Sequence, residues 1–294
     1  MHIGIIGLGK MGGNMRARLR DAGIDVTGYD PNPELTDVAD IPALVDALPS
    51  PRVLWVMVPS GAPTESVIEQ ASAVLEPGDI VVDGGNSRYT DDARHAAMLA
   101  EKGIRFVDVG VSGGVWGREN GYGLMAGGEA SDIETLLPVF DALRPEGPRE
   151  EGFVHAGSAG AGHYAKMVHN GIEYALMQAW AEGYELLQAR DDLISDVPGT
   201  FKAWQRGTVV RSWLLDLLVK ALEEDPDFTQ IAGYVEDSGE GRWTVHEALD
   251  RAVPVPTISA AIFARFVSRQ QDSPSMKAVA ALRNQFGGHS VRKS

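Results

Sequence analysis

The chain has 294 residues, 44% of them hydrophobic, and a formal net charge of −15 at pH 7. A chain of this length can bury a sizeable core and favours two ordinary domains over a single large one. The acidic balance argues against nucleic acid as a general partner, because a polyanion is bound by a basic surface, and the lack of cysteine excludes disulfides and cysteine-ligated zinc.

Short apolar runs rich in β-branched residues alternate with amphipathic stretches in the first half of the chain. The runs cover residues 3–6, 26–30, 53–58, 80–83 and 106–109. This alternation predicts βαβ units and a parallel sheet covered by helices. No apolar run approaches the roughly 20 residues that cross a bilayer, and the N-terminus leads into a strand without a basic leader. We therefore expect a soluble, cytoplasmic protein with no membrane partner.

Helical spacing replaces the strand pattern beyond residue 157. Apolar residues recur along one helix face at Val168, Ile172, Ala175, Ala179 and Leu186. The glycine-rich residues 157–162 separate the two patterns. The sequence therefore predicts an α/β chain in which a Rossmann dinucleotide-binding domain, residues 1–156, is followed by an all-α domain, residues 157–294.

A glycine-rich turn follows the first predicted strand and opens a helix. It fits the G-x-G-x-x-G pattern and consists of Gly7, Leu8, Gly9, Lys10, Met11 and Gly12. The first glycine permits a tight turn, the second lets backbone amides approach a pyrophosphate, and the third permits close helix packing. The strand and helix on either side make this pattern much more specific than the glycines alone.

Asp30 ends the second predicted strand, about 20 residues beyond the glycine turn. A carboxylate at this point can accept hydrogen bonds from a ribose hydroxyl and repel a 2′-phosphate, which favours NAD over NADP. The alternative is that Asp30 only caps the following turn. We also expect cofactor contacts from Val58, Pro59 and Asn86.

Two more glycine-containing turns follow strands at the carboxyl edge of the predicted sheet, where open α/β folds bind ligands. The first is Asp83-Gly84-Gly85-Asn86-Ser87, in which Asn86 can orient either a nicotinamide or a substrate. The second is Ser112-Gly113-Gly114, whose glycines let backbone amides face an anion. The alternative for both is an ordinary turn from strand to helix.

Lys166 and Glu173 are the candidate catalytic residues. Their spacing of seven (173 − 166) returns the side chain to within roughly 20° of the same helix face. His169 and Asn170 lie between them on the same polar stripe. A solvated charged face is the alternative. Against it, the helix starts at the glycine-rich junction beside the cofactor domain, and ligand clefts favour domain interfaces.

The segment from His163 to Tyr174 closely resembles the catalytic helix of 6-phosphogluconate dehydrogenases, within the β-hydroxyacid dehydrogenase superfamily. Further segments similar to motifs of this family are residues 83–86, 111–114, 262–265 and 283–289. The likeness follows the order of the chain from residue 3 to residue 289. Because the helical part is too short for the duplicated region of the long enzymes, the chain resembles a short, NAD-preferring form.

The resemblance implies oxidative decarboxylation of 6-phospho-D-gluconate to D-ribulose 5-phosphate and CO2, with reduction of NAD and no metal, in the pentose phosphate pathway or gluconate metabolism. NADP is the less favoured cofactor. Lys166 would be the general base, and Glu173 would protonate carbon after CO2 is lost. The implied substrate contacts are Asn86, Ser112, Gly113, Gly114, His169, Asn170, Tyr174, Arg265, Arg283 and His289.

The resemblance also assigns the phosphate of this phosphosugar acid to Arg265, Arg283 and His289, and guanidinium groups suit bidentate phosphate binding. In the family the last two residues reach a neighbouring subunit's site. A homodimer or homotetramer with C-terminal segments that complete neighbouring sites is therefore implied. Ser238 stands where longer members place a phosphate-contacting lysine, and Arg242 is a further candidate contact or a brace for its loop.

Two other functions remain open from the sequence. A nondecarboxylating β-hydroxyacid dehydrogenase acting on a smaller acid would need Lys166 but not Glu173 or the phosphate-binding cations. A non-catalytic NAD-binding sensor or scaffold would keep only the fold. The presence of both Lys166 and Glu173 argues against the sensor.

Overall fold

The computed structural model describes residues 1–292. The chain divides into two compact units, Met1–Asn170 and Gly171–Ser294. This division falls inside helix α7 (Ala161–Gln188), so the first turns of α7 belong to the first unit. The domain boundary expected after residue 156 stays a prediction. Within residues 1–292, no helix is both long enough and apolar enough to span a membrane.

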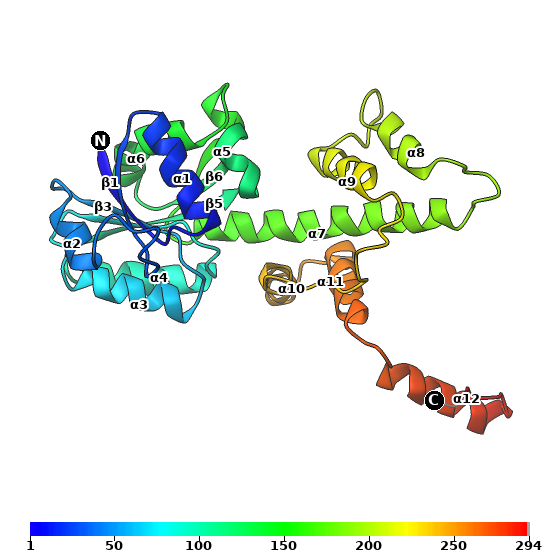
Figure 1. Cartoon of the computed structure of the whole chain (residues 1–294). Helices are drawn as coiled ribbons and strands as arrows, with labels where there is room; N and C mark the ends of the chain where they lie inside the picture. Colours follow the sequence, from blue (N-terminus) through cyan, green and yellow to red (C-terminus); the bar gives the residue numbers. More distant parts are fainter. Residues whose placement is uncertain (293–294) are drawn as a thin grey trace. The chain divides into compact units, whose positions relative to one another are not determined.

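The first unit contains a seven-stranded sheet with helices on both faces (Figure 1). In space the strands follow the order β2-β1-β3-β4-β5-β6-β7. Their bounds are His2–Ile6 (β1), Asp25–Tyr29 (β2), Val53–Val56 (β3), Ile80–Asp83 (β4), Arg105–Ser112 (β5), Gly123–Gly127 (β6) and Phe153–Gly157 (β7). Each of the five predicted runs corresponds to one of the strands β1 to β5, although β2 ends at Tyr29 and β3 at Val56, before the ends of their runs. These five strands pair in parallel, which confirms the predicted α/β architecture.

Strands β6 and β7 were not predicted. Strand β6 pairs antiparallel with β5 and parallel with β7. Its sequence, Gly-Leu-Met-Ala-Gly, contains two glycines and no β-branched residue, so its local strand propensity is weak. The three central residues of β7 are exposed, and the strand therefore lacks an alternating pattern. Pairing of β6 with β5, and of β7 with β6, determines these strands more than their own residues do.

Helices of the first unit cover both faces of the sheet (Figure 1). Their bounds are Lys10–Asp21 (α1), Ile41–Asp46 (α2), Ala62–Ser72 (α3), Tyr89–Ala100 (α4), Gly117–Asn120 (α5) and Ala130–Leu143 (α6), with short 3-10 turns at Gly114–Trp116 and Arg149–Glu151. Helix α1 begins at Lys10, within the glycine-rich motif of residues 7–12, so this motif opens a helix as predicted.

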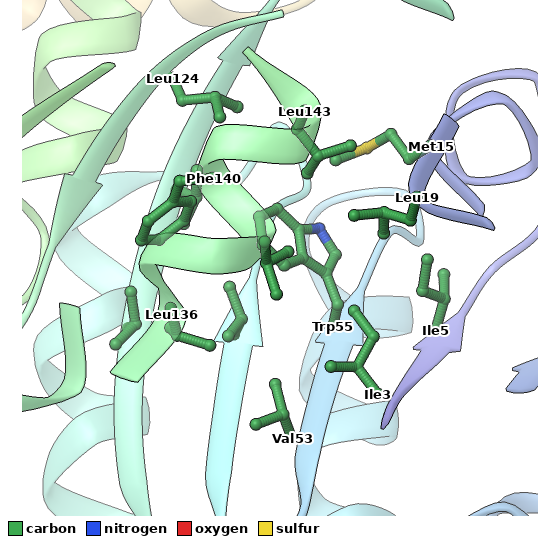
Figure 2. Close-up of a cluster of buried hydrophobic side chains, with 14 of the residues drawn as sticks. Ile3, Ile5, Met15, Leu19, Val53, Trp55, Leu124, Leu136, Phe140 and Leu143 are labelled. Atoms are coloured by element: carbon green, nitrogen blue, oxygen red, sulfur yellow. The ribbon is translucent and has the colours of Figure 1, made fainter. Parts of the chain in front are cut away.

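Side chains of the strands alternate between two hydrophobic clusters. Ile5 and Trp55 pack with α1 and α6 on one face, whereas Leu54 packs with α2 and α3 on the other. Figure 2 shows the first cluster, in which Trp55 lies among side chains of α1 and α6 and meets the Phe140 ring edge-on at a centroid distance of 6.1 Å. Because both faces are buried, the strands appear in the sequence as nearly continuous apolar runs.

The second unit contains helices joined by loops and no strand within residues 171–292, as predicted. It contains the rest of α7 and the helices Val197–Trp204 (α8), Trp213–Glu224 (α9), Glu240–Asp250 (α10), Pro256–Ser268 (α11) and Pro274–Gly287 (α12). One apolar cluster joins α8 and α9 to Trp180 of α7. A second joins α10 and α11 to Tyr174. Both clusters therefore pack on the part of α7 that belongs to the second unit.

Candidate active site

The glycine turn connects β1 to α1 with little room for side chains. Gly7 has a φ of 93°, a conformation that favours glycine. A Cβ on Gly12 would lie 1.9 Å from the Gly7 carbonyl oxygen, so the turn can close only with glycine at this position. Gly9 has open space where its Cβ would be. Since Gly9 directly precedes α1, backbone amides at a helix N-terminus are accessible to an anion, which fits a pyrophosphate-binding turn.

The other predicted residues of this turn differ in exposure. Leu8 is buried in the core, Met11 is half-buried and packs against the same cluster, and Lys10 is exposed at the first position of α1. Leu8 and Met11 therefore anchor the turn, and only Lys10 presents its side chain to solvent.

Asp30 is bonded to the glycine turn itself. Its Oδ2 accepts a hydrogen bond from the Leu8 amide at 2.7 Å, and its Oδ1 accepts one from the Asn32 amide at 2.8 Å. Asp30 therefore caps the turn that follows β2, which was the alternative to ribose binding. Each carboxylate oxygen has a second acceptor position, so a ribose hydroxyl can still donate to Asp30.

The segment that follows β2 carries no free cation. Residues 31–40 contain neither lysine nor arginine. Asp37 in this segment pairs with Arg16 at 3.3 Å and Arg20 at 2.8 Å, two cations from α1. Both arginines are therefore already engaged with a carboxylate of this segment.

Val58 and Pro59 lie beside the glycine turn, whereas Asn86 lies further along the sheet. The Val58 Cγ1 atom is 3.0 Å from the position of a Cβ on Gly7. The Pro59 carbonyl accepts a hydrogen bond from the Thr64 hydroxyl at 3.0 Å. Asn86 is exposed in the turn after β4, which is separated from β1 by β3.

Four predicted site residues form one hydrogen-bonded group at the end of β5. The Asn170 Oδ1 atom accepts a hydrogen bond from Lys166 Nζ at 2.5 Å and lies 2.9 Å from His169 Nδ1. The His169 Nε2 atom lies 3.3 Å from the Ser112 hydroxyl. This group belongs to the first unit and connects the last residue of β5 to three residues of α7.

Gly113 and Gly114 directly follow this group. Their φ angles of 135° and 53° are ones that residues with side chains rarely adopt. Gly114 is exposed and has open space where a Cβ would be. Backbone amides in the turn are thus free of covering side chains, as expected for contact with an anionic group.

A buried carboxylate of β5 caps the first turn of α7. Asp108, with 0% of its surface exposed, accepts hydrogen bonds from the amides of Gly160 at 2.6 Å and His163 at 2.8 Å. Amides at a helix start lack partners within the helix, and negative charge is favourable there. Asp108 was not among the predicted site residues. Its sequence did indicate a special role, because it is the one carboxylate within an apolar strand, Phe106-Val107-Asp108-Val109.

His163 is buried against a second carboxylate. Its Nδ1 atom lies 2.8 Å from Asp92 Oδ2 of α4. Burial lowers the pKa of His163, but the hydrogen bond and charge of Asp92, with the charges of Asp83 and Asp108, outweigh this effect and raise the pKa to about 9. The imidazolium form is therefore expected at neutral pH.

The expectation of a metal-free site stays a prediction. Within residues 1–292, two buried groups of side chains have potential ligand atoms within 4.8 Å of one another. They are Asp83, Asp92 and His95, and Asp92, Asp108 and His163.

Tyr174, Ser238 and Arg265 come together in the second unit. The Arg265 guanidinium lies over the Tyr174 ring, 3.5 Å from its centroid. The Tyr174 hydroxyl lies 3.0 Å from the Ser238 hydroxyl and accepts a hydrogen bond from the Ser238 amide at 3.1 Å. The Ser238 hydroxyl donates to the buried Glu240 carboxylate at 2.7 Å. Ser238 thus has its own acceptor, and Arg265 supplies the positive charge of this group.

The remaining predicted residues are Arg242, Glu173, Arg283 and His289. Arg242 pairs with Asp237 at 2.8 Å. It therefore braces its own loop, which was the alternative to a phosphate contact. Glu173 is half-buried in the part of α7 that belongs to the second unit. Arg283 and His289 are exposed on α12 and just after it.

Comparison with known proteins links both parts of the chain to one family. The family model described as the NAD binding domain of 6-phosphogluconate dehydrogenase matches residues 2–145. The model described as the 6-phosphogluconate dehydrogenase C-terminal domain matches residues 162–293.

Similar relatives include both short and long proteins. The chain is 41% identical, over its whole length and 99% of the relative, to a Haloferax volcanii protein named 6-phosphogluconate dehydrogenase, NAD(+)-dependent, decarboxylating. A Bacillus subtilis protein of the same name is 34% identical over 90% of this chain, which covers 61% of that protein. Among solved structures, Plasmodium falciparum 6-phosphogluconate dehydrogenase has a TM-score of 0.82 at 26% identity; the match covers 100% of this chain and 66% of that one.

The buried His163 predicts a loss of stability at alkaline pH. Its pKa is raised from 6.5 to about 9 in the folded chain, so its stabilising contribution is complete below pH 6.5 and is lost as the pH rises through 9. We expect the free energy of unfolding, measured by urea denaturation, to fall as the pH rises between these values. His163→Gln should flatten this dependence, and His155→Gln, at an exposed position in the same unit, should not. If the free energy of unfolding changed equally with pH in the native chain and in both variants, His163 would not be the group that titrates.

Proposed function

This chain belongs to the 6-phosphogluconate dehydrogenase family, and we propose that it converts 6-phospho-D-gluconate to D-ribulose 5-phosphate and CO2 with NAD as the oxidant. The observation that carries the proposal is the hydrogen-bonded group of Lys166, His169, Asn170 and Ser112 at the carboxyl end of β5. Parallel sheets of this type bind ligands at that edge. The 41% identity to a full-length relative with this named activity supports the same reaction.

The first step requires a base at the substrate's 3-hydroxyl. In our proposal the neutral Lys166 amine takes the hydroxyl proton. NAD, which the glycine turn and Asp30 would hold, would supply the oxidant that removes hydride from the same carbon. This leaves a 3-keto acid and a protonated lysine. Asn170 holds Lys166 Nζ through its Oδ1, and His169 holds the same oxygen, so the amine is oriented before substrate binds. Such orientation lowers the entropic part of the barrier.

The second step uses the charge that the first step creates. When the carboxyl carbon leaves as CO2, its bonding electrons form an enolate, and the ammonium of Lys166 stabilises the enolate oxygen. An acid must then deliver a proton to carbon, and we assign this role to Glu173. It lies in α7 seven residues after Lys166, which corresponds to about two turns of helix.

We propose that the substrate phosphate binds at Arg265. Stacking on the Tyr174 ring orients the guanidinium, and a guanidinium can bind two phosphate oxygens at once. The Ser238 proton is already bonded to Glu240, so Ser238 does not replace a lysine charge. Local cations of this kind are necessary because the chain as a whole carries a net charge of −15.

We further propose a homodimer or homotetramer in which Arg283 and His289 complete a neighbouring subunit's site. Helix α12 supports this proposal because it exposes large apolar side chains at a spacing of three residues. They are Met276, Val279 and Leu282, with exposures of 60%, 45% and 68%. An apolar helix stripe of this kind is typical of a surface that packs against another chain.

The preference for NAD rests on the segment after β2. A 2′-phosphate would approach the Asp30 carboxylate, and residues 31–40 offer no cation to bind it. Arg16 and Arg20 are already paired with Asp37. A ribose with two free hydroxyls meets no such repulsion. The sequence alternative of a smaller, nonphosphorylated acid is less favoured, because it gives the Arg265 and Tyr174 pair no role.

Replacement of the lysine tests the reaction directly. We expect Lys166→Met to lower kcat for NAD reduction with 6-phosphogluconate by a factor of about 10² to 10⁴, the usual contribution of a general base. The dissociation constant for NAD, measured by fluorescence titration, should change little because the lysine acts on the substrate. The matched control is Lys202→Met, at an exposed residue of α8 that pairs with Glu223. Unchanged turnover, or loss of NAD binding instead of turnover, would contradict the assignment.

Replacement of Asp30 tests the cofactor preference. Asp30→Asn keeps an oxygen for the Leu8 amide but removes the charge that repels a 2′-phosphate. We expect the ratio of kcat/KM for NAD to that for NADP to fall by about tenfold. Glu34→Gln removes an exposed carboxylate from the same segment and should leave the ratio unchanged. The same ratio in Asp30→Asn as in the native chain would remove the electrostatic argument for NAD.

A further inference from the structure

We propose that strand β5 positions Lys166 through two residues that act on α7. The Asp108 carboxylate fixes the first turn of this helix, and the bare backbone of Gly110 sets how closely the base of the Lys166 side chain approaches the sheet. The inference rests on the proposed role of Lys166. Asp108 and Gly110 act through the helix, so both are positioning residues.

Alternate residues of β5 meet successive turns of α7. Asp108 binds the amides of Gly160 and His163 at the helix start. Two residues further along, Gly110 contacts Lys166. After two more, the Ser112 hydroxyl lies 3.3 Å from His169.

The spacing of these contacts explains how a strand can set the register of a helix. Two residues advance about 6.6 Å along a strand, and one helical turn advances about 5.4 Å. One face of β5 therefore contacts α7 at three consecutive levels. Lys166 occupies the middle level and is held from both sides.

Gly110 controls the distance between the helix and the sheet. A Cβ added to it would lie 2.4 Å from Lys166 Cβ and 2.7 Å from the Gly162 carbonyl oxygen. Both atoms are fixed by the helix backbone, so any side chain at this position must displace the helix. The φ angle of Gly110 is not positive, and close approach is the reason that glycine is needed there.

Strand β6 also contacts the start of α7 through backbone atoms with no side chain between them. A Cβ on Gly127 of β6 would lie 2.7 Å from the Ser158 carbonyl oxygen and 2.8 Å from the Ala161 nitrogen. On the helix side, a Cβ on Gly162 would lie 2.3 Å from the Met125 carbonyl oxygen of β6. The start of α7 therefore rests directly on the backbones of β5 and β6, and Lys166 follows one turn later.

Asp108 fixes the helix along its axis. Each of its oxygens accepts one amide hydrogen bond, and the side chain has no exposed surface. The Asp92–His163 pair adds a second attachment of the same turn to α4. Because a displacement of about 1 Å at a reacting group can cost about 10² in rate, a small shift of this turn would reach the lysine amine as a loss of activity.

A single added methyl group tests the proposal. Gly110→Ala should lower kcat for 6-phosphogluconate oxidation at least tenfold while the dissociation constant for NAD stays within twofold of the native value. Gly123→Ala is the matched control: it adds the same methyl group to the adjacent strand β6, where no atom beyond the chain neighbours lies closer than 3.9 Å. The control should keep kcat within twofold of native. A merely structural role would lower the melting temperature of Gly110→Ala but leave kcat per folded molecule unchanged, and that result would overturn the proposal.

A readout independent of turnover separates this inference from the proposed function. Trace acetylation by acetic anhydride, followed by mass spectrometry, reports the reactivity of each lysine amine. In Gly110→Ala we expect at least a twofold change at Lys166 and none at Lys202. If the native chain does not oxidise 6-phosphogluconate but this change occurs, the proposed function fails and the positioning stands. If folded Gly110→Ala reacts at Lys166 as the native chain does, the positioning fails.

A second variant covers the case in which Gly110→Ala does not fold. Asp108→Asn has nearly the same shape as the native side chain but presents an amide nitrogen to one of two N–H donors. We expect the same change in Lys166 acetylation and the same loss of kcat with NAD affinity retained. If folded Asp108→Asn showed the native reactivity of Lys166 towards acetic anhydride and the native kcat, the proposal would be overturned.

Discussion

The bare-backbone contact between β5 and the start of α7 is the constraint on which the rest of the site depends. Glycines at positions 110, 127 and 162 allow the helix to rest on the sheet at a distance that no side chain would permit. Asp108 then fixes the helix along its axis by capping its first amides. Lys166, His169 and Asn170 follow at successive turns, so their positions result from the packing of the first turn.

The proposed substrate is acidic, and so is the chain, so the distribution of charge matters for the proposed binding. The net charge is −15, but carboxylates around the start of α7 are buried, and Asp92 and Asp108 are bonded to His163 and to helix amides. Near β2, Asp37 forms ion pairs with both Arg16 and Arg20. The cations assigned to the substrate, Lys166 and Arg265, instead lie at positions fixed by Asn170 and by the Tyr174 ring. Local placement of charge therefore determines binding more than the net charge does.

The sequence predicts those parts of the molecule that have a local pattern. Buried parallel strands appear as apolar runs, the glycine turn has a fixed spacing, and the polar stripe from Lys166 to Asn170 follows helical periodicity. Strands β6 and β7 have no such pattern and are stabilised by pairing, β6 with β5 and β7 with β6. The contact of Gly110 with Lys166 joins residues 56 positions apart (166 − 110), and nothing in the local sequence of either residue indicates the other. Asp108 did carry a signal, since an unpaired carboxylate in a buried strand is unfavourable and requires hydrogen-bond donors from elsewhere in the chain.

The account requires that one helix carry both the base for oxidation and the acid that follows decarboxylation. The most direct measurement uses 6-phosphogluconate labelled with carbon-13 at its carboxyl carbon and compares labelled CO2 with NADH formed by the purified chain. We predict one labelled CO2 for each NADH throughout the reaction. NADH formed without labelled CO2 would show oxidation alone, and would contradict the roles assigned to Lys166 and Glu173 in the second step.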